Sequence, residues 1–282
     1  MMRISNNSLE LLLHGPQDGF YCGTRFDRAG VFDGVLWDGV QLCDRWFERY
    51  DPFAHDAVCG PAEEFSQIGF EEAAPGGTFL KPGVGLLVRP DDAPYDRFRL
   101  YGIADPGSWE LAQDAGKVVF KHSLPGIYEY VKEIVLTGPS SFEIRHSFAS
   151  PEPLALEVYN HNFWTLGLLA TGPSRLVDFP FRPAGDWRAE YDSVAFTASG
   201  VRFSRPLEKG ESVYTGNIHD AAGGGMPYII SLRDNGIRVL IRGSVPVVRT
   251  VLWANHRIAC LEPYNVFTSP FNWTVRYDFS HE

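Results

Sequence analysis

Several stretches in the second half of this chain alternate apolar and polar residues with a period of two, and this period most constrains the fold. Residues 142–148 place three apolar side chains and His146 on one face of such a period, residues 273–279 place four apolar or aromatic side chains there, and residues 194–196 follow it briefly. Successive side chains of a β-strand point to opposite faces of a sheet. Each stretch therefore predicts a strand with one buried face.

The pair Asn235-Gly236 separates two apolar runs, residues 228–232 and 237–241. Both residues tolerate the positive φ values of a tight turn, so we expect a β-hairpin there. Residues 10–14 and 108–115 could each form a turn or two of helix, but no window sustains a helical stripe over 12 residues. The sequence predicts an all-β protein with residues 1–282 in one domain, without a repeat or linker.

Composition and charge exclude several classes of protein. The chain has 25 Lys+Arg against 35 Asp+Glu, a net charge of -10, whereas nucleic-acid binders need a basic surface. The best candidate for a membrane span, residues 239–253, contains Arg242 and Arg249, and we expect no signal peptide at the polar N-terminus. We expect a soluble cytoplasmic protein, monomer or homodimer, without nucleic-acid or membrane partners.

The cysteines and histidines predict no metal or cofactor. The four cysteines, at positions 22, 43, 59 and 260, show no C-x-x-C spacing, which favours free thiols over disulfides or a zinc site. The histidines are too far apart in sequence for an obvious metal cluster. Phosphate-binding loops, H-E-x-x-H and G-x-S-x-G are absent, and the glycines at 223–225 lack a following helix and indicate a loop.

Two segments place a titratable side chain near the end of an apolar strand. His161 lies in Tyr-Asn-His-Asn-Phe-Trp, residues 159–164, shortly before Gly167. Glu262 follows an apolar run, and Pro263 restricts it to an extended backbone. Either residue suits proton transfer, although a core histidine and a solvated glutamate are the ordinary alternatives.

Two earlier segments supply charged candidates among glycines and aromatic residues. Arg25 lies in Gly-Thr-Arg-Phe-Asp-Arg, residues 23–28, and could bind sugar hydroxyls, an anion or a neighbouring acid. Glu63 and Glu64 lie in Cys-Gly-Pro-Ala-Glu-Glu-Phe, residues 59–65, and Lys81 follows. A solvated ammonium is the ordinary alternative for Lys81.

In their order along the chain, these segments resemble the galactose mutarotase-like superfamily, the aldose 1-epimerases. That family has an early Arg in a G-R-like segment, a catalytic His in an H-x-F-[FW]-x-L context and a Glu in an L-E-P segment. Here Arg25, His161 and Glu262 occupy the corresponding positions. The resemblance implies a large antiparallel β-sandwich with a sugar cleft and no cofactor.

The resemblance also implies roles for individual residues. Glu262 is expected as the base and His161 as the acid that interconvert the α and β anomers of an aldose. Substrate contacts are expected from five residues: Arg25, Glu64, Lys81, Trp164 and Tyr264.

Two departures from the family pattern affect the expected substrate. The family's further His, in an H-G-G-P-like segment, is replaced by residues 59–65 with two acids, and its substrate-binding Asp has only Asp178 and Asp220 as candidates. We therefore expect a sugar other than plain galactose, with acidic, phosphorylated or otherwise modified aldoses as alternatives. A non-catalytic sugar-binding protein is the main rival, and a polysaccharide lyase ranks last.

Overall fold

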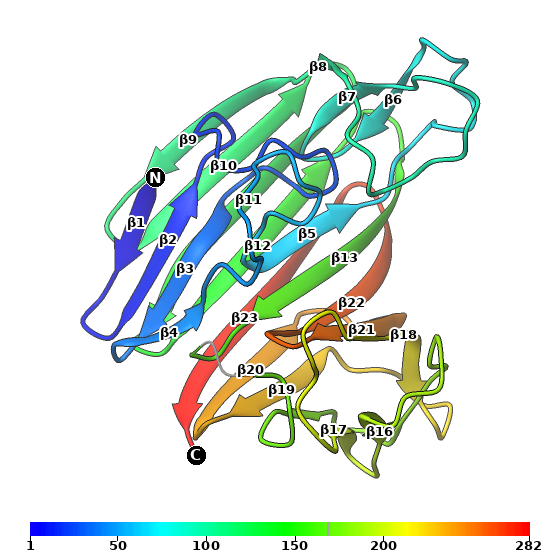
Figure 1. The fold of residues 1–282 in the computed structure, drawn as a ribbon. Coiled ribbons are helices and arrows are strands. Elements are labelled where there is room, and N and C mark those ends of the chain that lie inside the picture. Colours follow the sequence, from blue (N-terminus) through cyan, green and yellow to red (C-terminus); the bar gives the residue numbers. More distant parts are fainter. Residues whose placement is uncertain (168–169) are drawn as a thin grey trace.

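The computed structural model describes residues 1–167 and 170–282, and this part of the chain contains antiparallel sheets and no helix (Figure 1). The prediction of an all-β sandwich is confirmed. Consequently none of the described residues forms a helix able to cross a membrane.

The largest sheet has ten strands. In their order across the sheet they are β16 (Val194–Phe196), β17 (Gly200–Phe203), β14 (Leu176–Asp178), β19 (Ile229–Asp234), β20 (Ile237–Gly243), β23 (Phe271–His281), β12 (Ser141–Ala149), β11 (Tyr128–Gly138), β10 (Lys117–Leu124) and β9 (Ser108–Gln113).

A six-stranded sheet carries the candidate site. Its strands, in order, are β15 (Pro183–Ala184), β18 (Ser212–Asp220), β21 (Arg249–Asn255), β22 (Ala259–Thr268), β13 (Ala155–Trp164) and β5 (Gly60–Phe65). Two smaller sheets consist of β1 (Met2–Ser5), β2 (Leu9–His14), β3 (Val31–Trp37) and β4 (Val40–Cys43), and of β6 (Thr78–Lys81), β7 (Gly85–Val88) and β8 (Ile103–Asp105).

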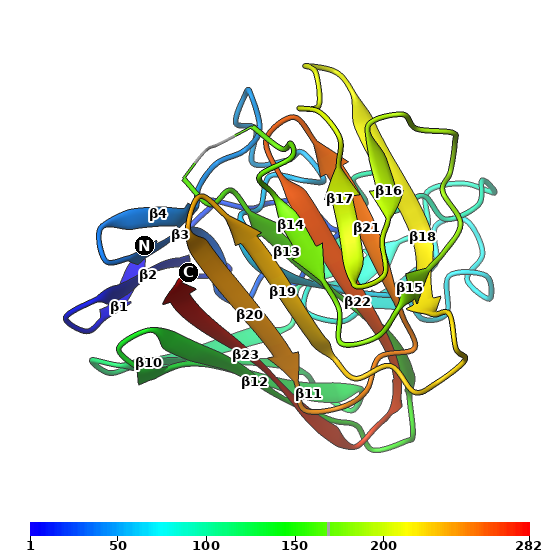
Figure 2. The same cartoon turned by 90° about the horizontal axis from the view of Figure 1, so that it is seen from below.

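The main hydrophobic core lies between the ten-stranded sheet and a layer formed by β1–β4 and the six-stranded sheet (Figures 1 and 2). Phe32 of β3 packs against Phe142 of β12, with ring centroids 5.8 Å apart. Trp164 of β13 packs against Tyr277 of β23 at 5.7 Å. Burial of such aromatic side chains is the dominant favourable contribution to folding.

The predicted hairpin is confirmed. Strands β19 and β20 pair in antiparallel register, and Asn235 and Gly236 have φ values of 52° and 72°. The predicted strands near residues 142–148, 194–196 and 273–279 are β12, β16 and β23.

The expectation of helical turns at residues 10–14 and 108–115 was wrong. Leu9, Leu11 and Leu13 of β2 are buried while their neighbours are half-buried, which is a period of two that the short leucine run concealed. Strand β9 is an edge strand, and its pairing with β10 determines its conformation although its side chains show no clear apolar face.

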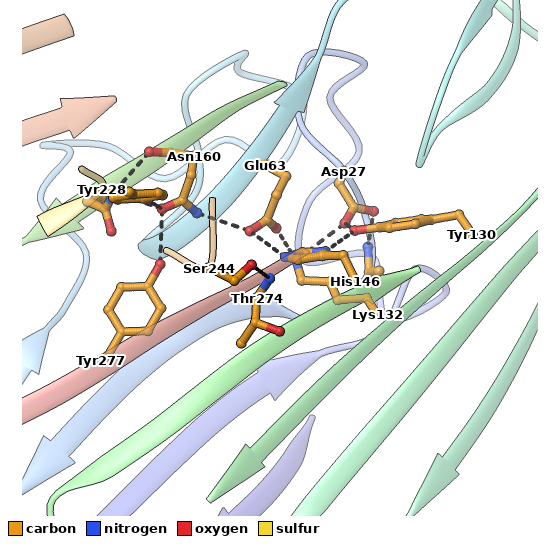
Figure 3. A network of polar contacts seen from close by, with 12 residues as sticks. Asp27, Glu63, Tyr130, Lys132, His146, Asn160, Tyr228, Ser244, Thr274 and Tyr277 are labelled. Carbon is orange, nitrogen blue, oxygen red and sulfur yellow. Dashed lines mark hydrogen bonds and ion pairs between the residues drawn. The ribbon is translucent and has the colours of Figure 1, made fainter. Parts of the chain in front are cut away.

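A buried polar network lies between the two large sheets (Figure 3). The ammonium of Lys132 on β11 contacts two carboxylates, Oδ2 of Asp27 at 3.3 Å and Oε2 of Glu63 at 2.5 Å. His146 lies 3.4 Å from the other oxygen of Glu63, and the hydroxyl of Tyr130 donates to Asp27. Lys132, Asp27 and Glu63 are all buried, so every charge in this group depends on its partners.

The network continues through Asn160 of β13. Its amide donates to Glu63 at 3.1 Å, while its carbonyl oxygen accepts hydrogen bonds from the hydroxyls of Tyr228 and Tyr277. Asn160 thereby connects the six-stranded sheet to β23 of the ten-stranded sheet (Figure 3).

Candidate functional site

A cavity of about 780 Å³ lies on the face of the six-stranded sheet opposite the core. Strands β13, β18, β21 and β22 supply its inner surface: Tyr159, His161, Phe163, Tyr214, Val251, Trp253 and Glu262. The remaining lining residues come from loops, mainly residues 94–98 and 55–56, together with Arg25, Trp46 and Arg188. The volume is that of a small-molecule site.

Strand register determines which side chains face this cavity. Strand β13 pairs with β22 so that Tyr159 lies opposite Tyr264 and Asn162 opposite Leu261, which places Glu262 opposite His161. On its other side β13 pairs with β5, with Tyr159 opposite Glu64. Paired residues point to the same face of a sheet, so two strands bring a carboxylate toward His161.

The imidazole of His161 lies between these two carboxylates. Its Nε2 is 3.0 Å from Oε2 of Glu64, and its Nδ1 is 3.2 Å from Oε1 of Glu262. Burial alone lowers the pKa of His161, but the two flanking carboxylates outweigh it and raise the pKa above its ordinary value. The ring is therefore suited to hold a proton that it can deliver into the cavity.

Arg25 holds Glu64 in place. Its Nε donates to Oε2 of Glu64 at 2.8 Å, and Arg97 contributes a second cation 3.4 Å from Oε1. Burial raises the pKa of Glu64, but Arg25 and His161 reverse this and hold it well below its ordinary range. Glu64 is therefore an anion that orients the histidine.

Lys81 and Tyr264 lie behind the cavity surface rather than on it. Lys81 is buried, and its ammonium donates to the carbonyl oxygen of Phe65, the residue after Glu64. Burial lowers its pKa to about 8. Tyr264 packs against Tyr159, with ring centroids 4.7 Å apart, and so supports a residue that does line the cavity.

Trp164 lies on the other face of β13, which corrects its expected sugar contact. It is fully buried in the core against Tyr277 and Phe279. Trp164 is an odd number of residues from His161, so in a strand the two side chains point to opposite faces. Phe163 and Trp253 face the cavity instead.

His55 is a cavity residue that the sequence reasoning missed. Its Nδ1 lies 3.4 Å from Nη1 of Arg25, and its ring packs against that of Phe98, with ring centroids 4.7 Å apart. It lies four residues before the segment of residues 59–65, in which no histidine is present. A search of a wider stretch around that segment could therefore have found it. The loop with Arg97 and Phe98 carries no local signal, because only the tertiary fold brings it to the cavity.

Neither candidate for the family's aspartate lines the described part of the cavity. Asp178 pairs with Arg202 and Arg233 on the ten-stranded sheet, and Asp220 caps the loop of residues 222–224. The aspartates that do line the cavity are Asp56 and Asp96.

Tertiary structure also brings together donors that the sequence separates. Among the described residues, His161, Cys260 and Glu262 each offer one ligand atom within 4.8 Å of the other two. The spacing argument against a histidine-based metal cluster did not cover such a group, because His161 and Cys260 meet only through the pairing of β13 with β22. All four cysteines are free thiols.

The comparisons with known proteins bear on the fold. No family model matches the sequence, and no curated protein matches it significantly. Solved structures do match: a GalM/aldose epimerase homologue from C. elegans is 14% identical with a TM-score of 0.53, covering 99% of this chain and 98% of its own.

Two further structures carry mutarotase or epimerase names. A galactose mutarotase-like protein from Lactobacillus casei ATCC 334 is 11% identical, with a TM-score of 0.53 over 99% of this chain and 100% of its own. Galactose 1-epimerase from Lactobacillus acidophilus NCFM is also 11% identical, with a TM-score of 0.53 over 99% and 93%.

This chain therefore has the galactose mutarotase-like β-sandwich fold, as its motifs predicted. At this level of identity the likeness establishes the fold, and the activity has to be argued from the site.

Proposed function

We propose that the protein is an aldose 1-epimerase that interconverts the α and β anomers of a free or modified aldose. The observation that carries this proposal is the position of His161 between Glu64 and Glu262 on the surface of a sugar-sized cavity. A binding protein needs no such acid and base in contact with each other.

The reaction requires one base and one acid. Glu262 removes the proton from the C1 hydroxyl while protonated His161 gives a proton to the ring oxygen, and the C1–ring oxygen bond breaks to leave an open-chain aldehyde. Rotation about the C1–C2 bond presents the other face of the carbonyl. On reclosure His161 takes back the proton from the C5 hydroxyl, and Glu262 returns its proton to the carbonyl oxygen.

The remaining lining residues suit a sugar. Phe163, Trp253 and Tyr214 offer aromatic surfaces to the apolar face of a pyranose. Arg97 and Arg188 place two cations in the cavity lining beside Asp56 and Asp96, and neither arginine is buried. These cations support an aldose that carries an acidic, phosphorylated or otherwise modified group in preference to plain galactose.

A panel of freshly dissolved pure anomers tests activity and substrate together. Anomer exchange is followed by polarimetry or NMR for neutral, acidic and phosphorylated aldoses. We expect acceleration over the uncatalysed rate, with a modified aldose fastest. Fastest turnover of unmodified galactose contradicts the substrate proposal, and tight binding of a sugar without any acceleration replaces the epimerase with a sugar-binding protein.

A further inference from the structure

A buried thiol, that of Cys260, lies behind the cavity surface and beside the proposed acid and base. Cys260 lies two residues before Glu262 on β22 and pairs with Phe163, which lies two residues after His161 on β13. Two-residue steps keep side chains on one face of a strand, so the imidazole, the thiol and the carboxylate converge. One donor atom of each lies within 4.8 Å of the others, and all three side chains are buried.

His161 is oriented as metal-binding histidines are. Its Nε2 is engaged by Glu64 at 3.0 Å, and Glu64 is held by Arg25. Its buried Nδ1 forms no hydrogen bond of normal geometry, although a carboxylate oxygen of Glu262 lies 3.2 Å away. A histidine that binds a metal through one nitrogen commonly donates the other N–H to a carboxylate, which fixes the ring.

We propose that His161, Cys260 and Glu262 together bind a thiophilic divalent cation of the zinc class. One nitrogen, one sulfur and one oxygen donor, with a fourth position open, form the ligand set of a zinc site that accepts an exogenous ligand. His161 and Glu262 line the cavity, so the open position faces it. Magnesium and calcium prefer oxygen donors alone and fit this set poorly.

The geometry requires only a small contraction. Ligand atoms of a tetrahedral zinc site lie about 3.3–3.8 Å apart, as follows from metal–ligand bonds of about 2.0–2.3 Å. The three donor atoms here are separated by at most 4.8 Å, so side-chain adjustments on the order of 1 Å suffice.

Charge balance favours a dication. A neutral imidazole, a thiolate and a carboxylate carry two negative charges, which a divalent cation neutralises, so the bound site leaves no net buried charge. The thiol itself opposes binding, because burial raises the pKa of Cys260 well above its ordinary value. Coordination overcomes that cost, since a coordinating thiol is deprotonated by the metal.

Occupancy of this site has a consequence for catalysis, and that consequence rests on the proposed function. The cation engages the imidazole nitrogen and the carboxylate that the proposed epimerase needs for proton transfer. It is therefore expected to inhibit anomer exchange. Cation binding itself does not depend on the protein being an epimerase.

The test is titration of the metal-free protein with Co²⁺ alone, followed by absorption spectroscopy. We expect one equivalent to bind, with a thiolate-to-cobalt charge-transfer band and the visible bands of a tetrahedral ion. Cys260→Ser is expected to abolish the charge-transfer band and to weaken binding by more than the roughly 10–100-fold that loss of an outer-shell partner costs. Cys22→Ser is the matched control, because Cys22 is a free and more exposed thiol, and should change neither.

Glu64→Gln tests whether His161 is oriented for metal binding by Glu64 or merely lies near the other two donor atoms. Loss of the carboxylate that holds Nε2 should weaken Co²⁺ binding roughly tenfold to a hundredfold while the charge-transfer band persists. Because Cys260 is buried, folding of each variant is checked by circular dichroism, and Cys260→Ala replaces Cys260→Ser if the latter does not fold.

The proposal is overturned if wild type binds no stoichiometric Co²⁺, if the band survives loss of the Cys260 thiol, or if it disappears with Cys22→Ser. If the cation binds as expected and an established anomer exchange proceeds uninhibited, the metal site stands and the assigned catalytic pair is wrong.

Discussion

Glu63 and Glu64 are consecutive residues of β5, and they illustrate two uses of a buried carboxylate. Glu63 faces the core, where Lys132, His146 and Asn160 surround it (Figure 3). Glu64 faces the cavity side, where Arg25 and His161 hold it. Both are buried, and partners lower the pKa of both carboxyls well below the ordinary range. A depressed pKa therefore does not distinguish a structural carboxylate from a functional one.

The difference lies in what each group of partners leaves open. The partners of Glu63, namely Lys132, His146 and Asn160, are themselves buried between two sheets, and these three residues do not line the cavity. Glu64 contacts His161, and His161 contacts Glu262, whose side chain is 10% exposed and lines the cavity. The core group should therefore control stability, and the cavity group should control activity.

The largest expected effect is on the cavity side. Glu262→Gln and His161→Asn should each lower anomer exchange by about 10²–10⁴-fold, because each removes a positioned proton-transfer group. The double mutant should lose much less than the product of the single losses. Glu157→Gln, an exposed glutamate on β13, is the matched control. Wild-type exchange by both single variants contradicts the assignment.

The second effect is on the core side. Lys132→Met leaves Asp27 and Glu63 without their shared cation and should lower the free energy of unfolding by about 3–5 kcal/mol, measured by urea denaturation. Activity per folded molecule should be retained. Lys121→Met removes a surface pair with Glu129 and should change the free energy of unfolding very little, because solvent screens exposed ion pairs. Equal costs for the two variants would refute the structural role of the core group.

A third effect is the pH dependence of stability. Burial raises the pKa of Asp27 to about 6 from 3.8, with Lys132 opposing and Glu63 reinforcing the shift. The folded state therefore retains a proton that the unfolded state has lost between about pH 4 and pH 6. This stabilising contribution is present below pH 4 and is lost as the pH rises through 6.

Comparison with Asp27→Asn isolates that contribution. The difference in unfolding free energy between wild type and variant should shift by roughly 2–3 kcal/mol against the wild type from pH 4 to pH 7, because one pKa unit corresponds to about 1.4 kcal/mol. Urea denaturation across this range measures it. A difference that is constant with pH shows that Asp27 titrates normally.

The smallest predicted effect compares the two glutamates directly. Glu64→Gln removes the anion that engages His161 and should lower activity roughly tenfold to a hundredfold, the equivalent of about 1.5–3 kcal/mol for one charged hydrogen bond. Glu63→Gln should instead lower the melting temperature with little change in kcat. If both variants lose activity at unchanged stability, Glu63 is not a structural carboxylate and the proposed difference in role between Glu63 and Glu64 is wrong.

The sequence revealed the parts of the fold that local chemistry determines. The Asn235-Gly236 turn and the alternation in β12 and β23 were readable because turn geometry and side-chain period are local. The pairing of β9 with β10 is not local, and residues 108–115 were misread for that reason.

The candidate site could likewise be predicted from the sequence only where local patterns indicate it. His161 and Glu262 stood out because each lies near the end of an apolar strand in a segment with a family likeness. Counting residues along each strand could have predicted that Trp164 faces the core and that Cys260 shares a face with Glu262. His55 and Arg97 could not be assigned, because only the packing of distant loops brings them to the cavity.

The division of the cavity between strands and loops has an evolutionary consequence. The proposed acid and base lie on paired strands, where insertion of a single residue reverses the facing of every side chain that follows in the strand. Residues 94–98 and His55, by contrast, belong to loops, which tolerate substitution and changes of length. If the proposed function holds, a lineage with this architecture can exchange one sugar for another by loop variation while the acid and base on the strands are inherited unchanged.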